Sequence, residues 1–247
     1  MKLNQNNYYS VESNRQFFSV SQYKDFMKCE AMALAKIRGE YQPAMTKAML
    51  TGSFVDAYFE GTLDSFMKEH PEVFTRKKEL RSEYRKANEI IRRVTEDKLF
   101  AQFMSGEKQR IMTFELFGVP WKMKMDSYLP GICITDLKVV ANFRSLPLWR
   151  YDLQGAVYQE GVRLNTGEQL PFYLAVATKE RVTDFDIFQI TQPVLDIALR
   201  EVEMNIQHYV RVKAGVEKPA SCGKCDYCKR IKGAKIRDYS ELLEGIR

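Results

Sequence analysis

Hydrophobic residues recur at helical spacing near the start of the chain. In "SVSQYKDFMKCEAMALAKIRG" (residues 19–39) they fall on one face of a helix, three or four positions apart. The residues of this face are Tyr23, Phe26, Met27 and Ala31. Ser19 or Ser21 can cap the helix, because a serine hydroxyl accepts a hydrogen bond from a free backbone N–H of the first turn. The pattern therefore predicts a helix here.

Two further segments extend this helical texture. "MTKAMLTGSFVDAYFEG" (residues 45–61) is predicted to be a second helix. Residues 76–104 have the charged and apolar faces of a long amphipathic third stretch. Residues 1–110 are therefore predicted to form a helical N-terminal part.

The pattern changes at Ile111, where strand-like segments begin. "IMTFELFGV" (111–119) is predicted to be a strand, and "WKMKMDSYL" (121–129) alternates with a period of two. Pro130 and Gly131 then turn the chain into "ICITDLKVV" (132–140), which is apolar on both faces and is predicted to be a buried strand.

Helical and strand patterns then alternate to the end of the sheet region. Residues 148–164 and 193–213 are predicted helices, and residues 170–178 and 184–191 are predicted strands. This order favours one α/β domain over residues 1–247, with a central mixed sheet flanked by helices. The sheet and its helix occupy 111–192, and the last helix and a cysteine cluster occupy 193–247.

Composition and charge narrow the class of protein only slightly. The chain has 247 residues, 38 Lys and Arg against 32 Asp and Glu, and a net charge of +6, which is compatible with a polyanionic partner. No apolar run is long enough to span a bilayer, and "MKLNQNNYYS" lacks the apolar core of a signal peptide. We therefore expect a cytoplasmic protein with reduced thiols and no membrane partner.

Two carboxylates and a lysine are predicted to converge in the middle of the chain. Asp136 and Lys138 lie two apart in one strand, so their side chains share a face. A hairpin around Pro130 and Gly131 would bring Asp126 close to Asp136. Such a group suits Mg²⁺ or Mn²⁺, with the lysine placed to orient a water or neutralise developing charge. The alternative for Asp136 and Lys138 is a structural ion pair.

The predicted helix after this strand carries two polar residues on one face. Gln154 and Tyr158 are four positions apart, and this face can lie over the carboxylates. Alone, the pair would be read as a solvated helix face. Glu115 is a weaker candidate for an extra acid.

Three cysteines near the end of the chain have the spacing of metal ligands. In "SCGKCDYCKR" they stand at two-residue intervals, at Cys222, Cys225 and Cys228. A tetrahedral zinc site or an iron–sulfur cluster usually takes four protein ligands. Cys133 lies in the buried strand and is predicted to be a small core residue. Cys29 is the other candidate, although spacing alone cannot place it near the three.

Asp126, the "TDLK" of the strand and the Q-x-x-x-Y of Gln154 and Tyr158 together resemble the PD-(D/E)xK nuclease superfamily in its RecB-like form. The resemblance covers roughly residues 17–228 and is greatest to phage and prophage recombination exonucleases of the exonuclease VIII (RecE-like) type. It implies a restriction-endonuclease-like domain. It also implies that Asp126 and Asp136 bind the metal, that Lys138 is the catalytic lysine, and that Gln154 and Tyr158 contact water or DNA.

The sequence departs from this family at one metal-binding position. An earlier family helix often carries G-x-x-x-H, whose histidine is a metal ligand, whereas this chain reads "GSFVDAYFEG" with Asp56 at that place. A carboxylate can still bind Mg²⁺. Asp56 is therefore expected to complete the metal shell, with a surface carboxylate as the alternative.

The family resemblance also suggests the fourth cysteine. Some RecB-like nucleases carry an iron–sulfur cluster bound by one cysteine after an N-terminal helix and three after the nuclease core. Cys29 stands in that N-terminal setting. The C-x-x-C-x-x-C run matches ferredoxin-type [4Fe–4S] sites, although the relatives space these cysteines more widely. We expect a structural [4Fe–4S] cluster, with Zn²⁺ or no metal as alternatives.

The resemblance implies a Mg²⁺-dependent exonuclease that degrades linear duplex DNA from its ends during phage-type recombination or repair. A bacterial or phage-infected cell, a single-strand-annealing recombinase as partner and a homo-oligomeric ring belong to the same expectation. Basic residues in the third predicted helical stretch could contact DNA phosphates, or simply form a solvated helix face. They are Arg76, Lys77, Lys78, Arg81 and Arg85. The alternative function is a catalytically silent DNA-binding accessory protein with a structural metal.

Overall fold

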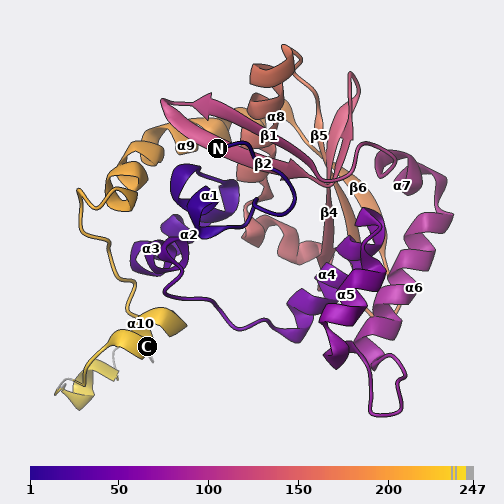
Figure 1. The fold of residues 1–247 in the computed structure, drawn as a ribbon, viewed down its shortest axis with the longest axis horizontal. Coiled ribbons are helices and arrows are strands. Elements are labelled where there is room, and N and C mark those ends of the chain that lie inside the picture. The colour runs from indigo at the N-terminus through magenta and orange to yellow at the C-terminus, as the bar shows by residue number, and fades with distance from the viewer. Residues whose placement is uncertain (235, 237, 243–247) are drawn as a thin grey trace.

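The β-strands lie between two groups of helices, one formed by α4 to α7 and the other containing α1 to α3 and α9 (Figure 1). This computed structural model describes residues 1–234, 236 and 238–242. Its mixed four-stranded sheet and helical N-terminal part confirm the predicted α/β fold class.

The first helices surround Cys29. They are α1 (Val11–Gln16), α2 (Val20–Lys28) and α3 (Glu30–Arg38). The single helix predicted over residues 19–39 is wrong in one respect, because the chain becomes extended at Cys29, with φ −172° and ψ 109°. Ser19 caps α2 by accepting from the N–H of Gln22 at 3.3 Å, which confirms one of the two predicted caps.

The next helices pack together on one side of the sheet. They are α4 (Lys47–Glu60), α5 (Leu63–Glu69), the 3₁₀ turn η1 (Pro71–Val73), α6 (Ser82–Glu96) and α7 (Lys98–Phe103). The long stretch predicted over 76–104 is therefore interrupted. Residues Phe74 and Leu80 form a β-bridge around a turn in which Lys78 takes a left-handed φ of 61°, so helix formation begins only at Ser82.

Six strands form two ladders. They are β1 (Arg110–Leu116), β2 (Val119–Met125), β3 (Ser127–Leu129), β4 (Cys133–Val140), β5 (Phe172–Thr178) and β6 (Phe185–Ile190). β1 and β2 form an antiparallel pair of their own, and the mixed sheet has the order β3-β4-β5-β6. The strand predicted over 121–129 is interrupted at Asp126, which lies between β2 and β3.

The remaining helices connect and cover the sheet. They are η2 (Phe143–Trp149), α8 (Tyr151–Thr166), α9 (Gln192–Lys213), α10 (Asp226–Ile231) and η3 (Tyr239–Leu242). α8 lies in the connection between β4 and β5, which are parallel neighbours and therefore need a crossover of this kind. Within the described ranges, no helix has both the length and the apolar character required to cross a membrane.

Two hydrophobic clusters cover opposite faces of the sheet. On β5, Phe172 and Leu174 belong to the cluster built with α8 and α9, whereas Ala175 belongs to the cluster built with α4 and α6. On β4, Ile134 belongs to the first cluster and Leu137 to the second. Because side chains alternate along a strand, Asp136 and Lys138 share the face of Ile134, toward α8.

α8 approaches the sheet closely because it carries a glycine at the contact. A Cβ at Gly155 would lie 2.7 Å from Phe172 Cδ1 and 2.8 Å from Leu195 Cδ2. We predict that Gly155→Ala lowers the free energy of unfolding by about 1–3 kcal/mol, because overpacking a close contact forces α8 away. Urea unfolding followed by circular dichroism measures this change.

Gly52→Ala is the matched control, because nothing lies within 4 Å of a Cβ at this position in α4. It should leave stability unchanged or raise it by up to about 1 kcal/mol, since alanine favours helix more than glycine does. Equal effects of the two substitutions would contradict the close packing of α8.

Candidate active site and cysteine cluster

A cleft of about 310 Å³ opens where α4, β2, β4 and α8 meet, and we call it the acidic cleft. It brings together six residues that the sequence singled out. They are Asp56, Asp126, Asp136, Lys138, Gln154 and Tyr158. Segments far apart in the sequence therefore share one cavity.

Asp126 is held at the junction between β2 and β3 by hydrogen bonds to both carboxylate oxygens. Oδ1 accepts from Gln109 Nε2 at 3.1 Å, and Oδ2 accepts from the backbone N–H of Leu137 at 2.9 Å. The second bond ties Asp126 to β4 beside Asp136. The predicted convergence of the two carboxylates is thus present, and it arises from the β3–β4 hairpin.

Asp136 is the more deeply buried carboxylate, with 2% of its surface exposed. Its Oδ1 accepts from Gln154 Nε2 at 2.7 Å, and its Oδ2 forms an ion pair with Lys138. Apart from that ion pair, Oδ2 has no hydrogen-bond donor. Such an atom costs free energy when buried and is available to a cation.

Lys138 lies between carboxylates and an aromatic ring. Its Nζ is 5.2 Å from the ring centroid of Tyr151. Burial by itself would lower the pKa of Lys138, but the carboxylates of Asp136 and Asp126 outweigh burial and raise it. Lys138 therefore carries its positive charge at neutral pH.

The polar face of α8 points into the acidic cleft. Gln154 donates to Asp136 as described, and Tyr158 donates its hydroxyl hydrogen to the backbone carbonyl of Lys124 at 3.1 Å. Tyr158 is buried, with 8% of its surface exposed. Gln154 therefore orients the carboxylate of Asp136, and Tyr158 links α8 to β2.

Two acids of α4 face the same cleft. Asp56 lines it and makes neither a hydrogen bond nor an ion pair with the described residues, and Glu60 lines it one turn later. Burial raises the pKa of Asp56, and the nearby Asp126 carboxylate raises it further. Glu60 was not predicted, although its i, i+4 spacing from Asp56 was visible in the sequence.

The charges of the acidic cleft fit a divalent cation. Burial raises the pKa of Asp136 although the Lys138 ammonium opposes the shift, and the Asp126 carboxylate raises the pKa of both Asp136 and Asp56 further. A hard cation bound by carboxylate oxygens would relieve this repulsion. Oδ2 of Asp136, which has Lys138 as an ion-pair partner but no hydrogen-bond donor, and the carboxylate of Asp56 are the groups best placed to bind it.

Several residues of the cleft had no signal in the sequence. The N-terminal segment contributes Tyr8 and Tyr9, α2 contributes Lys24, and β2 contributes Lys124. Lys24 Nζ donates to the carbonyl of Trp149 at 2.7 Å, and burial followed by the nearby Lys138 lowers its pKa to about 8. Their positions depend on tertiary packing, which local periodicity does not reveal.

The basic residues predicted as phosphate contacts lie outside the acidic cleft, in the turn before α6 and in its first turn. Arg81 donates to the carbonyls of Glu72 and Phe74, and Arg85 donates to the carbonyl of Leu80. Arg76, Lys77 and Lys78 share this turn. Glu115 is exposed on β1 and also lies outside the cleft, so its prediction as an extra acid of the site is wrong.

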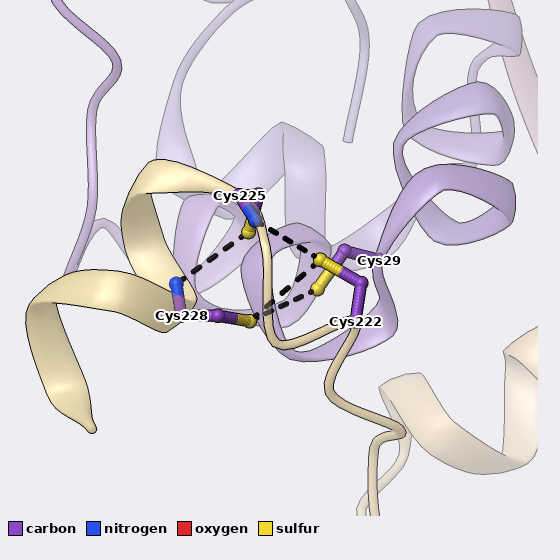
Figure 2. A group of neighbouring side chains, drawn as sticks. All are labelled: Cys29, Cys222, Cys225 and Cys228. Atoms are coloured by element: carbon purple, nitrogen blue, oxygen red, sulfur yellow. Dashed lines mark hydrogen bonds between the residues drawn. The ribbon is translucent and has the colours of Figure 1, made fainter. Parts of the chain in front are cut away.

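The four predicted cysteine ligands form a cluster, which we call the cysteine cluster. The sulfurs of Cys29, Cys222, Cys225 and Cys228 all lie within 4.8 Å of one another. Figure 2 shows the sulfurs directed toward one another, with Cys29 contributed by the break between α2 and α3. Two of the sulfur–sulfur distances are 3.5 Å, from Cys29 to Cys228, and 3.9 Å, from Cys222 to Cys228.

Backbone N–H groups donate to two of the sulfurs in this cluster, Cys222 Sγ and Cys225 Sγ. The N–H of Cys225 donates to Cys222 Sγ at 3.3 Å, and the N–H of Cys228 donates to Cys225 Sγ at 3.5 Å. Backbone N–H groups of Lys224 and Cys225 lower the pKa of Cys222 to about 6. The donor set therefore fits a cation that binds thiolates. Cys133 is buried in β4, away from the cluster, as predicted.

A second set of contacts holds the cysteine loop to α3 and α9. Glu30, directly after Cys29, accepts from the N–H of Ala220 at 2.7 Å. His208 of α9 contacts Glu30 through Nε2 at 2.6 Å and Glu217 through Nδ1 at 2.7 Å. The pKa of His208 is raised, mainly by its hydrogen bond to Glu30.

The fold and the acidic cleft together define a PD-(D/E)xK-type nuclease domain. The family described as "PDDEXK-like domain of unknown function (DUF3799)" matches residues 19–231, and the chain belongs to this family. The match contains the six predicted residues of the acidic cleft and the whole cysteine cluster, which confirms the superfamily resemblance.

A solved structure shows the same fold over nearly the whole chain. The "Putative exonuclease" from Eubacterium rectale is 45% identical, with 98% of each chain covered and a TM-score of 0.95. The structure of SSO0001 covers 87% of this chain and 97% of its own, at 14% identity and a TM-score of 0.34, which is too low to support an argument. No curated protein matches the chain. These comparisons support a nuclease.

His208 predicts a pH dependence that can be isolated. Its pKa is raised in the folded state, so the imidazolium between Glu30 and Glu217 stabilises the fold at low pH, and this contribution is lost as pH rises through the folded pKa. The urea midpoint of the unmodified protein should therefore fall relative to that of His208→Gln as pH rises from about 6.5, the unfolded value, through the folded pKa.

The chain has two histidines, so His70→Gln is the matched control. Its urea midpoint should follow that of the unmodified protein across the pH range. Identical pH profiles for His208→Gln and the unmodified protein would contradict a stabilising imidazolium at this place.

Proposed function

We propose that this protein is a divalent-metal-dependent deoxyribonuclease that hydrolyses phosphodiester bonds at the ends of linear duplex DNA. The observation that carries the proposal is the meeting of Asp126, Asp136 and Lys138 in one cleft. Membership of a PDDEXK-like family agrees with it. The exonuclease character is supported by the name of the Eubacterium rectale structure.

We assign binding of Mg²⁺ or Mn²⁺ to Asp126 and Asp136, with Asp56 as a further ligand. When bound, the cation supplies Lewis acidity toward the phosphate and a nucleophile at neutral pH. Burial and the nearby carboxylates make the negative charges of Asp136 and Asp56 unfavourable. A bound cation would offset this cost, which supports the assignment.

The remaining residues act by position and charge. The Lys138 ammonium neutralises negative charge that develops on the phosphate, and its raised pKa keeps it protonated. Gln154 holds Asp136 in one orientation through its amide hydrogen bond. Tyr158 fixes α8 against β2, so that the amide of Gln154 stays aimed into the cleft.

DNA phosphates are proposed to contact lysines at the cleft first. Lys24 and Lys124 both line it, one from α2 and one from β2. The five basic residues around the start of α6 are proposed as more distant phosphate contacts, because they lie outside the cleft. Two of them, Arg81 and Arg85, already donate to backbone carbonyls.

The proposal extends to the cellular pathway and to the partners of the protein. Recombination or repair in a bacterial or phage-infected cytoplasm, a single-strand-annealing partner and a ring-shaped homo-oligomer rest on the family resemblance alone and stay predictions.

Removal of either central charged residue should abolish hydrolysis. We expect Asp136→Ala and Lys138→Ala to release nucleotides from linear duplex DNA at least about 100-fold more slowly in Mg²⁺, because each removes several kcal/mol of transition-state stabilisation. Acid-soluble release from end-labelled DNA measures the rate.

Asp64→Ala is the control, since Asp64 is an exposed acid of α5 outside the cleft. It should degrade DNA at the unmodified rate. If the unmodified protein and the two cleft variants release equal background amounts, the enzyme proposal fails and the accessory DNA-binding alternative replaces it.

For the cysteine cluster we propose one tetrahedral Zn²⁺ with a structural role. A Zn–S bond of 2.3 Å places tetrahedral sulfurs about 3.8 Å apart, and two sulfur pairs here lie at 3.5 and 3.9 Å. In the [4Fe–4S] cluster that the sequence favoured, each thiolate binds a different iron, which holds the sulfurs farther apart. The spacing therefore supports zinc, and the iron–sulfur cluster is the alternative.

Cys29→Ala should lose the metal and much of the stability. We expect about one zinc per unmodified chain, a colourless protein, and a loss of more than about 3 kcal/mol in the variant, because metal binding contributes directly to folding. Metal analysis, absorbance spectra and urea unfolding measure this, with anaerobic purification.

Cys133→Ala is the matched control, a buried cysteine outside the cluster that should keep its metal and lose only about 1 kcal/mol. A brown protein with iron and labile sulfide would replace zinc by an iron–sulfur cluster. A Cys29→Ala variant with full metal content and stability would contradict the cluster altogether.

A further inference from the structure

A second hollow adjoins the acidic cleft, and no role has been assigned to it. It measures about 320 Å³ and lies between the N-terminal segment, α2, α3 and the residues that follow α3. We call it the tyrosine groove, because Tyr9 and Tyr41 line it together with the apolar Ile37 and Pro43. Tyr9 and Ser21 line both hollows, so they form the boundary between them.

The chemistry of the two hollows differs. The acidic cleft gathers Asp56, Asp126 and Asp136, whereas Asp25 is the carboxylate that lines the tyrosine groove, and it is already paired with Lys36. The groove therefore offers aromatic, apolar and amide surfaces without free acid. Its size falls at the lower end of small-ligand sites, roughly 300–1,000 Å³.

The ring of Tyr9 is exposed but is held in a defined position. It is 69% exposed, whereas its neighbour Tyr8 is 6% exposed and packs edge-on against it at 4.9 Å. Lys124 Nζ lies 4.9 Å from the centroid of the Tyr9 ring. An aromatic ring with a free surface beside a lysine is the arrangement that stacks a nucleobase next to a phosphate.

Buried hydrogen bonds fix the backbone that carries Tyr9. The carbonyl of Tyr8 accepts from the buried Lys122 ammonium, which also donates to Ser13 Oγ at 2.8 Å and Asn14 Oδ1 at 2.7 Å. Asn14 Nδ2 in turn donates to the carbonyl of Tyr9 at 3.2 Å. Less side-chain and backbone freedom is therefore lost when a ligand stacks on this ring.

We propose that Tyr9 stacks the nucleobase beside the cleaved phosphodiester, and that the tyrosine groove binds this nucleotide as part of an unpaired strand. The inference rests on the proposed nuclease function. An unpaired strand that enters the acidic cleft exposes its bases, and Tyr9 is the exposed aromatic residue that lines both hollows. Stacking tolerates every base, as a nuclease without sequence preference requires.

Substitution of Tyr9 separates nucleotide binding from phosphodiester chemistry. We expect Tyr9→Ala to raise the KM for a single-stranded oligonucleotide about 5- to 100-fold, the range that corresponds to loss of one stacked base, with little change in kcat. Tyr9→Trp should keep the low KM, because it keeps an aromatic surface. All variants should hydrolyse methyl p-nitrophenyl phosphate, which has no nucleobase, at equal rates.

Tyr58→Ala is the matched control. Tyr58 is also exposed, at 41%, and also packs edge-on against a neighbouring aromatic ring, Phe59 at 5.4 Å, but it lines neither hollow. Its KM for the oligonucleotide should equal that of the unmodified protein.

A binding measurement tests the inference apart from catalysis. Without divalent metal, an oligonucleotide that carries 2-aminopurine near its end should change fluorescence on binding the unmodified protein and Tyr9→Trp, but much less on binding Tyr9→Ala. Equal fluorescence changes and equal KM values for Tyr9→Ala and the unmodified protein would overturn the inference. Failure of the unmodified protein to release nucleotides from linear duplex DNA would instead overturn the nuclease proposal, while the fluorescence result would still decide the role of Tyr9.

Discussion

The buried carboxylate of Asp136 on the central strand β4 is the interaction around which the rest of the site is arranged. An isolated charge at this depth would be strongly unfavourable, so the fold supplies Lys138 from the same face of the strand and an amide from Gln154. One oxygen still lacks a hydrogen-bond donor. α8, which carries Gln154, packs closely on the sheet through Gly155, and the β3–β4 hairpin places Asp126 beside the same group.

The cysteine cluster joins the N-terminal helices to the segment that follows the last core helix. Cys29 lies at the start of the domain and three partners lie after the last helix of the core, so the cluster joins segments far apart in sequence. Contacts of Glu30 and His208 hold the same segments next to it. Because α2 also carries Lys24 into the acidic cleft, a metal at this cluster would steady one wall of the active site.

Much of the fold and of the site was predictable from local pattern, and the failures have physical reasons. The alternation along β4 and the turn at Pro130 and Gly131 correctly brought Asp126 to Asp136. The break at Cys29 was missed, because apolar spacing continues through it and only its position in the cysteine cluster requires extended backbone there. Lys24 and Tyr9 reach the cleft through tertiary packing, which a single sequence does not encode locally, whereas Glu60 had a visible signal in its i, i+4 spacing from Asp56.

The central claim is that the buried aspartates bind a divalent cation, and a diffraction experiment tests it most directly. Crystals grown with Mn²⁺ should give an anomalous difference peak within coordination distance of carboxylate oxygens of both Asp126 and Asp136. Crystals in which Mn²⁺ occupies only exposed carboxylates elsewhere, with no anomalous peak in the acidic cleft, would contradict the account.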